Sequence, residues 1–131
     1  MATRSNINVK VGDKYHSVYC HWDGYVSHNG AILLEHYNSQ ELAEKLVSEG
    51  DMSVLDERCD KPEGHSYDNR AEGRTVYYGR DRGEEDVGMR VVDEPLFEQS
   101  YSYVWDGEKW LVSGYDCDNI TVEEALKAGA E

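Results

Sequence analysis

Phenylalanine is almost absent from this chain, which contains one Phe beside ten tyrosines and three tryptophans. Tyr and Trp combine a large apolar area with one polar group, so they suit strands, half-buried positions and protein interfaces. Proline is scarce too, with two residues in 131, and no apolar run is long enough to cross a membrane. The expected organisation is therefore a single globular domain over residues 1–131.

The cysteines are too few and too dispersed for a disulfide framework. Cys20, Cys59 and Cys117 are odd in number, and no two of them are close in sequence. This pattern is typical of proteins from a reducing compartment. The first residues also lack the apolar segment of a secretory signal. We therefore expect a cytoplasmic protein with no membrane contact.

Basic residues are outnumbered by about two to one, with 13 Lys and Arg against 27 Asp and Glu and a net charge of −14. Such a charge repels nucleic acids and anionic membranes, so we expect neither as a direct partner. The excess is largest in residues 81–131, which hold fourteen acidic and four basic residues. An acidic face from this half would attract a basic protein surface. The side chains expected to form it are Glu84, Glu85, Asp86, Asp93, Glu94, Asp116 and Asp118.

Alternating polarity predicts two strands near the start, over residues 6–11 and 15–22, which pair as a hairpin. The first strand is expected to be half-buried, with its asparagines on the polar face. In the second strand, Val18, Cys20 and Trp22 share one face, so we expect Trp22 to anchor the core.

Helical spacing of apolar residues follows over residues 27–37 and 38–50, and Asn38 with Glu41 forms a capping-box pattern at the start of the second helix. Residues 51–57 are expected to form a short turn.

Later segments predict more strands. Residues 74–80 alternate as a strand, and residues 81–86 follow as a charged turn. The clearest hairpin spans residues 100–115 around Asp106-Gly107, and a short helix begins after Thr121. This order predicts an α+β fold: an antiparallel sheet of four or five strands, two main helices on one face, and a short C-terminal helix.

The stretch "YCHWDGYVSHNG" gathers residue types that can bind metals or act in catalysis. Neighbours on a strand point to opposite faces, so Cys20 and His21 do not converge on one ion. We predict neither a metal site nor a cofactor, and the chain has no catalytic signature motif. The exposed side of the stretch, with His21, Asp23, Tyr25 and His28, is a candidate contact surface.

The segment "YYGRDRGEED" is a candidate anion site. Arg80 and Arg82 would hold a phosphate or carboxylate in a forked geometry, and Arg70 and Arg74 lie just upstream. Nearby carboxylates would supply an acid or a base. The alternative is a solvated charged loop in which the opposite charges pair locally.

Several segments together resemble a family of small phage and prophage proteins. They are "TRSNI", "YCHWDGY" with "HNG", "LLEHYNSQELAEKLVSEGDMSVL", "YYGRDRGE" and "YVWDGEKWLV", and they cover most of the chain. The family has no established reaction, so the resemblance implies no catalytic residue. It implies a bacterial host cytoplasm, where such accessory proteins often bind and block host machinery.

These observations lead to one hypothesis and two alternatives. The hypothesis is a non-enzymatic protein that binds and inhibits a basic host or defence protein, such as a CRISPR, restriction or transcription component. The first alternative is a binder or enzyme for a nucleotide-like anion at the arginine-rich loop. The second is a structural or assembly role in a virion. The oligomeric state stays open.

Overall fold

The computed structural model describes residues 3–114 and 117–129, which form short strands and short helices. The strands are β1 (Ser5–Val11), β2 (Lys14–Cys20), β3 (Met52–Val54), β4 (Val76–Tyr77), β5 (Arg90–Val92), β6 (Tyr101–Trp105), β7 (Trp110–Ser113) and β8 (Ile120–Thr121). The helices are the π-helical turn η1 (Val26–Gly30), α1 (Ala31–His36), α2 (Gln40–Val47), α3 (Tyr78–Arg82) and α4 (Val122–Lys127).

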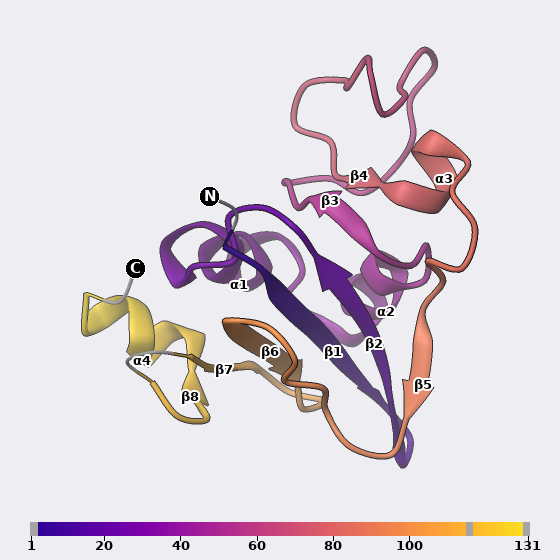
Figure 1. The fold of residues 1–131 in the computed structure, drawn as a ribbon. Coiled ribbons are helices and arrows are strands. Elements are labelled where there is room, and N and C mark those ends of the chain that lie inside the picture. Colours follow the sequence, from indigo (N-terminus) through magenta and orange to yellow (C-terminus); the bar gives the residue numbers. More distant parts are fainter. Residues whose placement is uncertain (1–2, 115–116, 130–131) are drawn as a thin grey trace.

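All of these strands belong to one sheet. Its order is β4-β3-β2-β1-β6-β7-β8, and β5 also pairs with β2. The β1–β6 and β2–β3 pairs are parallel, whereas the other pairs are antiparallel. Helices α1 and α2 lie behind the β1–β2 hairpin in Figure 1, so one face of these central strands is covered by helices.

Both predicted hairpins are confirmed. β1 and β2 pair antiparallel from Ser5↔Cys20 onward. β6 and β7 pair antiparallel up to Trp105↔Trp110. In the second hairpin, the Asp106 carboxylate accepts two backbone N–H bonds within the turn, each of 2.9 Å. Local alternation and turn chemistry were sufficient to identify these pairs.

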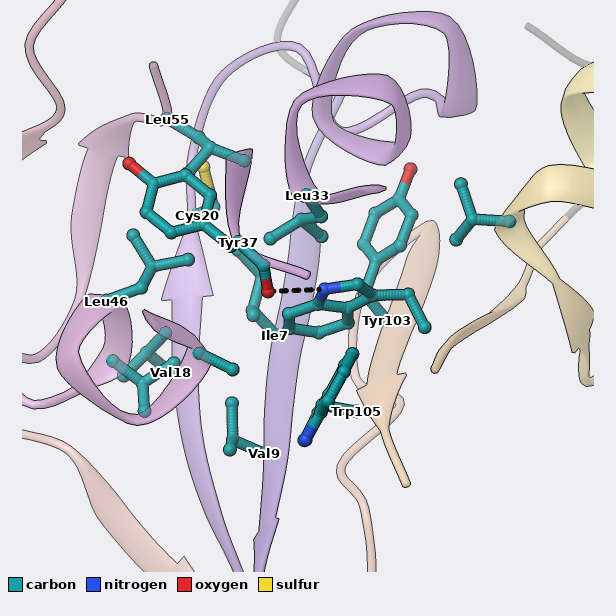
Figure 2. Packing of buried hydrophobic residues seen from close by; sticks show 14 of the residues in the cluster. Ile7, Val9, Val18, Cys20, Leu33, Tyr37, Leu46, Leu55, Tyr103 and Trp105 are labelled. Atoms are coloured by element: carbon teal, nitrogen blue, oxygen red, sulfur yellow. Dashed lines mark hydrogen bonds between the residues drawn. The ribbon is translucent and has the colours of Figure 1, made fainter. Parts of the chain in front are cut away.

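The apolar core lies between the sheet and the helices (Figure 2). Ile7 from β1 and Val18 from β2 meet Leu33 from α1, and all three side chains are fully buried. The Trp110 indole N–H donates to the Tyr37 carbonyl oxygen at 3.1 Å, so this buried polar group is satisfied. Each fully buried aliphatic side chain stabilises the fold by about 1.5–3 kcal/mol.

Helices α2 and α4 each begin with a side-chain cap. Ser39 Oγ accepts the Leu42 N–H at 3.2 Å at the start of α2. The predicted Asn38 cap is therefore wrong by one position. At α4, Thr121 Oγ1 accepts the Glu124 N–H at 3.1 Å, as predicted. Each cap satisfies one of the free N–H groups in a first helical turn.

The other face of β1 is polar and also buried, which contradicts the expectation of a half-buried strand. Asn8 bonds both backbone groups of Leu96, at 2.8 Å to its N–H and 3.2 Å to its carbonyl. The Glu98 N–H donates to Asn6 Oδ1 at 2.7 Å. The segment between β5 and β6 therefore covers these asparagines like an additional layer, and no local pattern indicates this.

The predicted fold class, an antiparallel sheet of four or five strands with two main helices and a short C-terminal helix, is wrong. The sheet has eight strands and is mixed. Residues 51–57, expected as a turn, contain β3, and the strand expected over 74–80 divides into β4 and α3. Strands of two or three residues are too short to show a period of two. The parallel β1–β6 pairing joins segments that are far apart in sequence.

Candidate interaction surface

The turn after β2 points a tryptophan outward. The N–H of His21 donates to Met52 O at 3.1 Å, and that of Trp22 donates to Ser53 O at 3.0 Å, so backbone pairing with β3 continues past Cys20. The Trp22 side chain is 42% exposed. The prediction that Trp22 anchors the core is therefore wrong. The strand β2 ends at Cys20, two residues earlier than predicted. The alternation of faces that placed Trp22 in the core therefore does not extend to Trp22.

Three of the four predicted contact residues meet beyond this turn. Asp23 adopts a φ of 57°, which reverses the chain. The Tyr25 hydroxyl donates to Asp23 Oδ1 at 3.2 Å, and the Tyr25 and His28 rings lie 6.1 Å apart. The negative charge of Asp23 raises the pKa of Tyr25, which keeps this hydroxyl protonated and able to donate.

The fourth predicted contact residue, His21, lies with a different set of rings. The Tyr19 hydroxyl is 2.6 Å from His21 Nδ1. The Trp22 ring packs edge-on to the imidazole, with centroids 4.8 Å apart and an interplanar angle of 88°. Burial and the nearby Arg4 charge lower the pKa of His21. The imidazole is therefore neutral at neutral pH, and it shares one hydrogen bond with the Tyr19 hydroxyl through Nδ1.

A second pair of aromatic rings contacts an arginine guanidinium. The Tyr67 and Tyr78 rings lie 6.0 Å apart with an interplanar angle of 30°. Arg82 Cζ is 4.6 Å from the Tyr67 centroid and 5.0 Å from that of Tyr78. Both distances are within the range of a cation–π contact. The Arg82 guanidinium also bonds Glu84 at 2.6 Å.

We name these side chains the outer strip: Trp22, His21, Tyr19, Tyr78 and Tyr67. Tyr19 alternates with the buried Val18 and Cys20, so it lies on the sheet face opposite the helices. Asp51 joins the two parts of the strip: its carboxylate accepts the Tyr19 N–H at 2.8 Å, and its backbone carbonyl accepts the Tyr78 N–H at 3.1 Å. Sequence reasoning missed its three tyrosines as site residues, and the only available signal was the unusual tyrosine content.

The arginines of the candidate anion site diverge. Residues two apart in a helix do not share a side, and Arg80 and Arg82 are both in α3. Arg80 bonds the Asp81 carboxylate at 2.8 Å and the carbonyl of Cys59. Arg82 instead turns to the outer strip. The structure does not bring the two guanidiniums together as a fork.

Asp81 is a buried structural carboxylate, not part of a solvated turn. Its side chain accepts the Tyr77 N–H at 2.8 Å and contacts His65 Nε2 at 3.2 Å, in addition to Arg80. The Nδ1 of His65 accepts the Ala71 N–H at 3.0 Å, so the ring donates to Asp81 through Nε2. Burial acts to raise the pKa of Asp81, but hydrogen bonds from Arg80 and Tyr77 outweigh it and lower the pKa.

The remaining predicted arginines are also paired within the chain. Arg74 lies 3.3 Å from the Asp60 carboxylate, and Arg70 lies 3.9 Å from that of Asp56. Arg74 lines a hollow of about 290 Å³, and Arg80 lines another of about 210 Å³. Pockets for drug-sized ligands begin at roughly 300 Å³, so the hollow at Arg74 is at this lower limit and the hollow at Arg80 is below it.

The predicted acidic side chains that the structure describes lie in separate segments: Glu84, Glu85 and Asp86 after α3, Asp93 and Glu94 after β5, and Asp118 before β8. Asp116 lies outside the described residues. In Figure 1 the segment after α3 and the turn before β8 are on opposite sides of the molecule. Five of these acids therefore precede or follow the short strand β5, and Asp118 lies apart from them.

Comparison with known proteins adds no relative: no family model, curated protein or solved structure matches the chain. Among the helices of the described ranges, none has the length and apolar character that crossing a membrane requires.

Proposed function

We propose that this chain is a non-enzymatic, phage-type binding protein that attaches to a basic host or defence protein in a bacterial cytoplasm and blocks it. The partner's basic surface would normally hold nucleic acid, and the exposed carboxylates of this chain would take the place of phosphates.

The observation that supports this proposal most is that arginines of the chain form ion pairs with its own carboxylates. Arg80 pairs with Asp81, Arg82 with Glu84, and Arg90 with Glu98. The acidic excess of fourteen charges is therefore left without internal compensation. Exposed carboxylates without an ion-pair partner among the described residues include Glu85, Asp86, Glu94 and Asp118. A field of this sign speeds encounter with a basic surface and opposes nucleic acid.

The alternative of a nucleotide-like ligand at Arg80 and Arg82 has weaker support. Each guanidinium already has a carboxylate partner, and the two point in different directions. No feature of the described ranges favours the virion-assembly alternative, which mass spectrometry of purified particles would test.

The test is a pull-down from bacterial lysate with the tagged full chain as bait. Proteins retained at about 50 mM salt and released at about 500 mM salt are identified by mass spectrometry, because screening weakens contacts between exposed charges. We expect basic nucleic-acid-binding proteins to be enriched and duplex DNA to displace the bait from them. The absence of any such protein at low salt, or enrichment that DNA does not reduce, would contradict the proposal.

A charge-matched pair of variants controls for non-specific attraction. Glu85→Lys/Asp86→Lys reverses two free carboxylates after α3. Glu41→Lys/Glu124→Lys reverses two exposed helical carboxylates that also have no ion-pair partner among the described residues, and it changes the net charge equally. We expect the first variant to lose the partner at a lower salt concentration than the second.

A further inference from the structure

We propose that the outer strip is the docking surface for arginine and lysine side chains of the basic partner, and that Arg82 occupies one of these positions in the free protein. This inference rests on the proposed function, because it names the surface that such a partner would contact. The strip joins Trp22 and His21, which lie beside β3, to Tyr78, the first residue of α3, and to Tyr67.

The chain itself shows that the strip accepts a guanidinium. The Arg82 cation contacts the faces of two tyrosine rings while Glu84 neutralises its charge. Aromatic faces attract cations through their quadrupole, and arginine is the cation most often found there. A partner arginine that replaces Arg82 would meet the same two rings and the same carboxylate.

The opposite end of the strip has an exposed aromatic surface. Trp22 is 42% exposed, and its described ring contact is with His21, edge-on. Trp, Tyr and Arg are the residues that dominate binding energy at protein interfaces. The exposed acids Asp68 and Glu85 neighbour the strip's Tyr67 and Arg82–Glu84 pair in sequence. At the Tyr67 and Tyr78 end, the charge therefore favours a basic segment over a nucleic acid, whereas the Arg4 cation lies near Tyr19 and His21 at the other end.

Tryptophan fluorescence provides a direct readout. Trp105 and Trp110 are 2% and 1% exposed, so a change in emission on ligand addition reports on Trp22. The probe is a peptide of about ten residues that alternates Arg with Gly, titrated at about 50 mM salt, where screening is weak. We expect the emission to change with saturation. We also expect Trp22→Ala to weaken binding, measured by anisotropy of a labelled peptide, at least about fivefold.

Two matched controls separate the strip from general charge and exposed apolar area. Phe97 is also an exposed aromatic, at 54%, but lies in the segment between β5 and β6, so Phe97→Ala should change the affinity less than about twofold. Arg82→Ala and Arg90→Ala each remove one exposed cation that pairs with a glutamate. Only Arg82→Ala removes a cation from the tyrosine faces. The peptide should therefore bind to Arg82→Ala about three times more tightly than to Arg90→Ala.

The outcomes distinguish this inference from the proposed function. If the wild-type chain retains basic proteins from lysate but Trp22→Ala and Phe97→Ala behave alike, the docking surface is elsewhere and only the inference fails. Equal effects of Arg82→Ala and Arg90→Ala would also overturn it. If a single-stranded oligothymidine changes Trp22 emission and the arginine peptide does not, the strip binds nucleic acid. If neither lysate proteins nor the peptide bind, the proposed function fails as well.

Discussion

At the scale of single residues, the fold separates charged groups with structural roles from charged groups that remain available. Asp81 joins several parts of the chain through one carboxylate, which contacts Arg80, His65 and the Tyr77 backbone. The carboxylates of Glu85 and Asp86, a few residues further along, are exposed. Composition alone counts all of these groups equally, so only the structure shows which acids a partner can reach.

Replacing Asp81 with Asn should strongly destabilise the protein. Asp81→Asn leaves the largely buried Arg80 charge without its counter-ion, and breaking a buried ion pair from one side costs about 3–5 kcal/mol. Urea unfolding measures the loss. The control is Asp60→Asn, which breaks a half-exposed pair with Arg74 and should cost less than about 1 kcal/mol. Equal losses would contradict this reading of Asp81.

The stabilisation that Asp81 provides should depend on pH. The pKa of Asp81 is lowered in the folded state, so its contribution to stability is complete above the unfolded pKa near 3.9 and is lost as the pH falls through the folded pKa. The difference in unfolding free energy between wild type and Asp81→Asn should therefore narrow below about pH 4. A difference that is unchanged on acidification would show that the carboxylate acts only through its shape.

Cys20 should resist alkylation in the native protein. Its thiol is fully buried beside Asn29, and burial raises its pKa to about 12. The thiolate is the reactive form, and at pH 8 it would be about one part in ten thousand. Iodoacetamide should label Cys59 before Cys20, as read by peptide mass spectrometry. In urea both should react at similar rates, and equal rates in the native state would contradict the buried assignment.

At the scale of elements, the sequence predicted what neighbouring residues determine. The β1–β2 and β6–β7 hairpins follow from alternation and short turns, and both were identified correctly. The short strand β3 and the parallel β1–β6 pair depend on contacts between distant segments, so local pattern could not show them. The outer strip was missed for the same reason, since Tyr67 and Tyr19 come from separate elements.

The turn between α2 and β3 contains a glycine that a larger residue cannot replace easily. At Gly50 the backbone φ is +89°, and an added Cβ would lie 2.4 Å from the Val87 carbonyl oxygen. At Gly12, in the β1–β2 turn, φ is +65° but the space is open. Gly12→Ala should cost about 1–2 kcal/mol for the left-handed backbone, and Gly50→Ala at least about 2 kcal/mol more because backbone must move.

Urea unfolding of both glycine variants measures this difference. The denaturant slope should stay unchanged, so that the midpoints report stability alone. Similar midpoints for the two variants would mean that the segment before β5 moves away from Gly50 without cost. That result would remove the packing argument for how this segment is positioned.

At the scale of the whole molecule, net charge was readable from the sequence but its arrangement was not. The net charge of −14 predicts self-repulsion in any compact state. The predicted acidic residues all belong to residues 81–131, and the structure shows that the described ones precede or follow β5, except Asp118, which lies before β8. Exposed acids repel one another through solvent, which makes their effect sensitive to ionic strength.

Salt should therefore stabilise this protein. Screening weakens its few surface ion pairs, each worth less than about 1 kcal/mol, but it also weakens repulsion among the excess carboxylates, and with this charge imbalance the second effect is larger. Raising NaCl from about 10 mM to about 200 mM shortens the screening length from roughly 30 Å to less than 10 Å. We expect the melting temperature to rise by a few degrees, measured by circular dichroism.

A charge-reduced variant shows whether repulsion is the cause. Glu85→Lys/Asp86→Lys/Glu94→Lys/Asp118→Lys replaces exposed carboxylates that have no ion-pair partner among the described residues. Because it lowers the net negative charge, it should melt at a higher temperature than wild type at low salt and respond less to added NaCl. If both proteins respond equally, the salt effect comes from ion exclusion at the protein surface. The exposed acids would then cost the fold little, and their role would lie in attracting a partner.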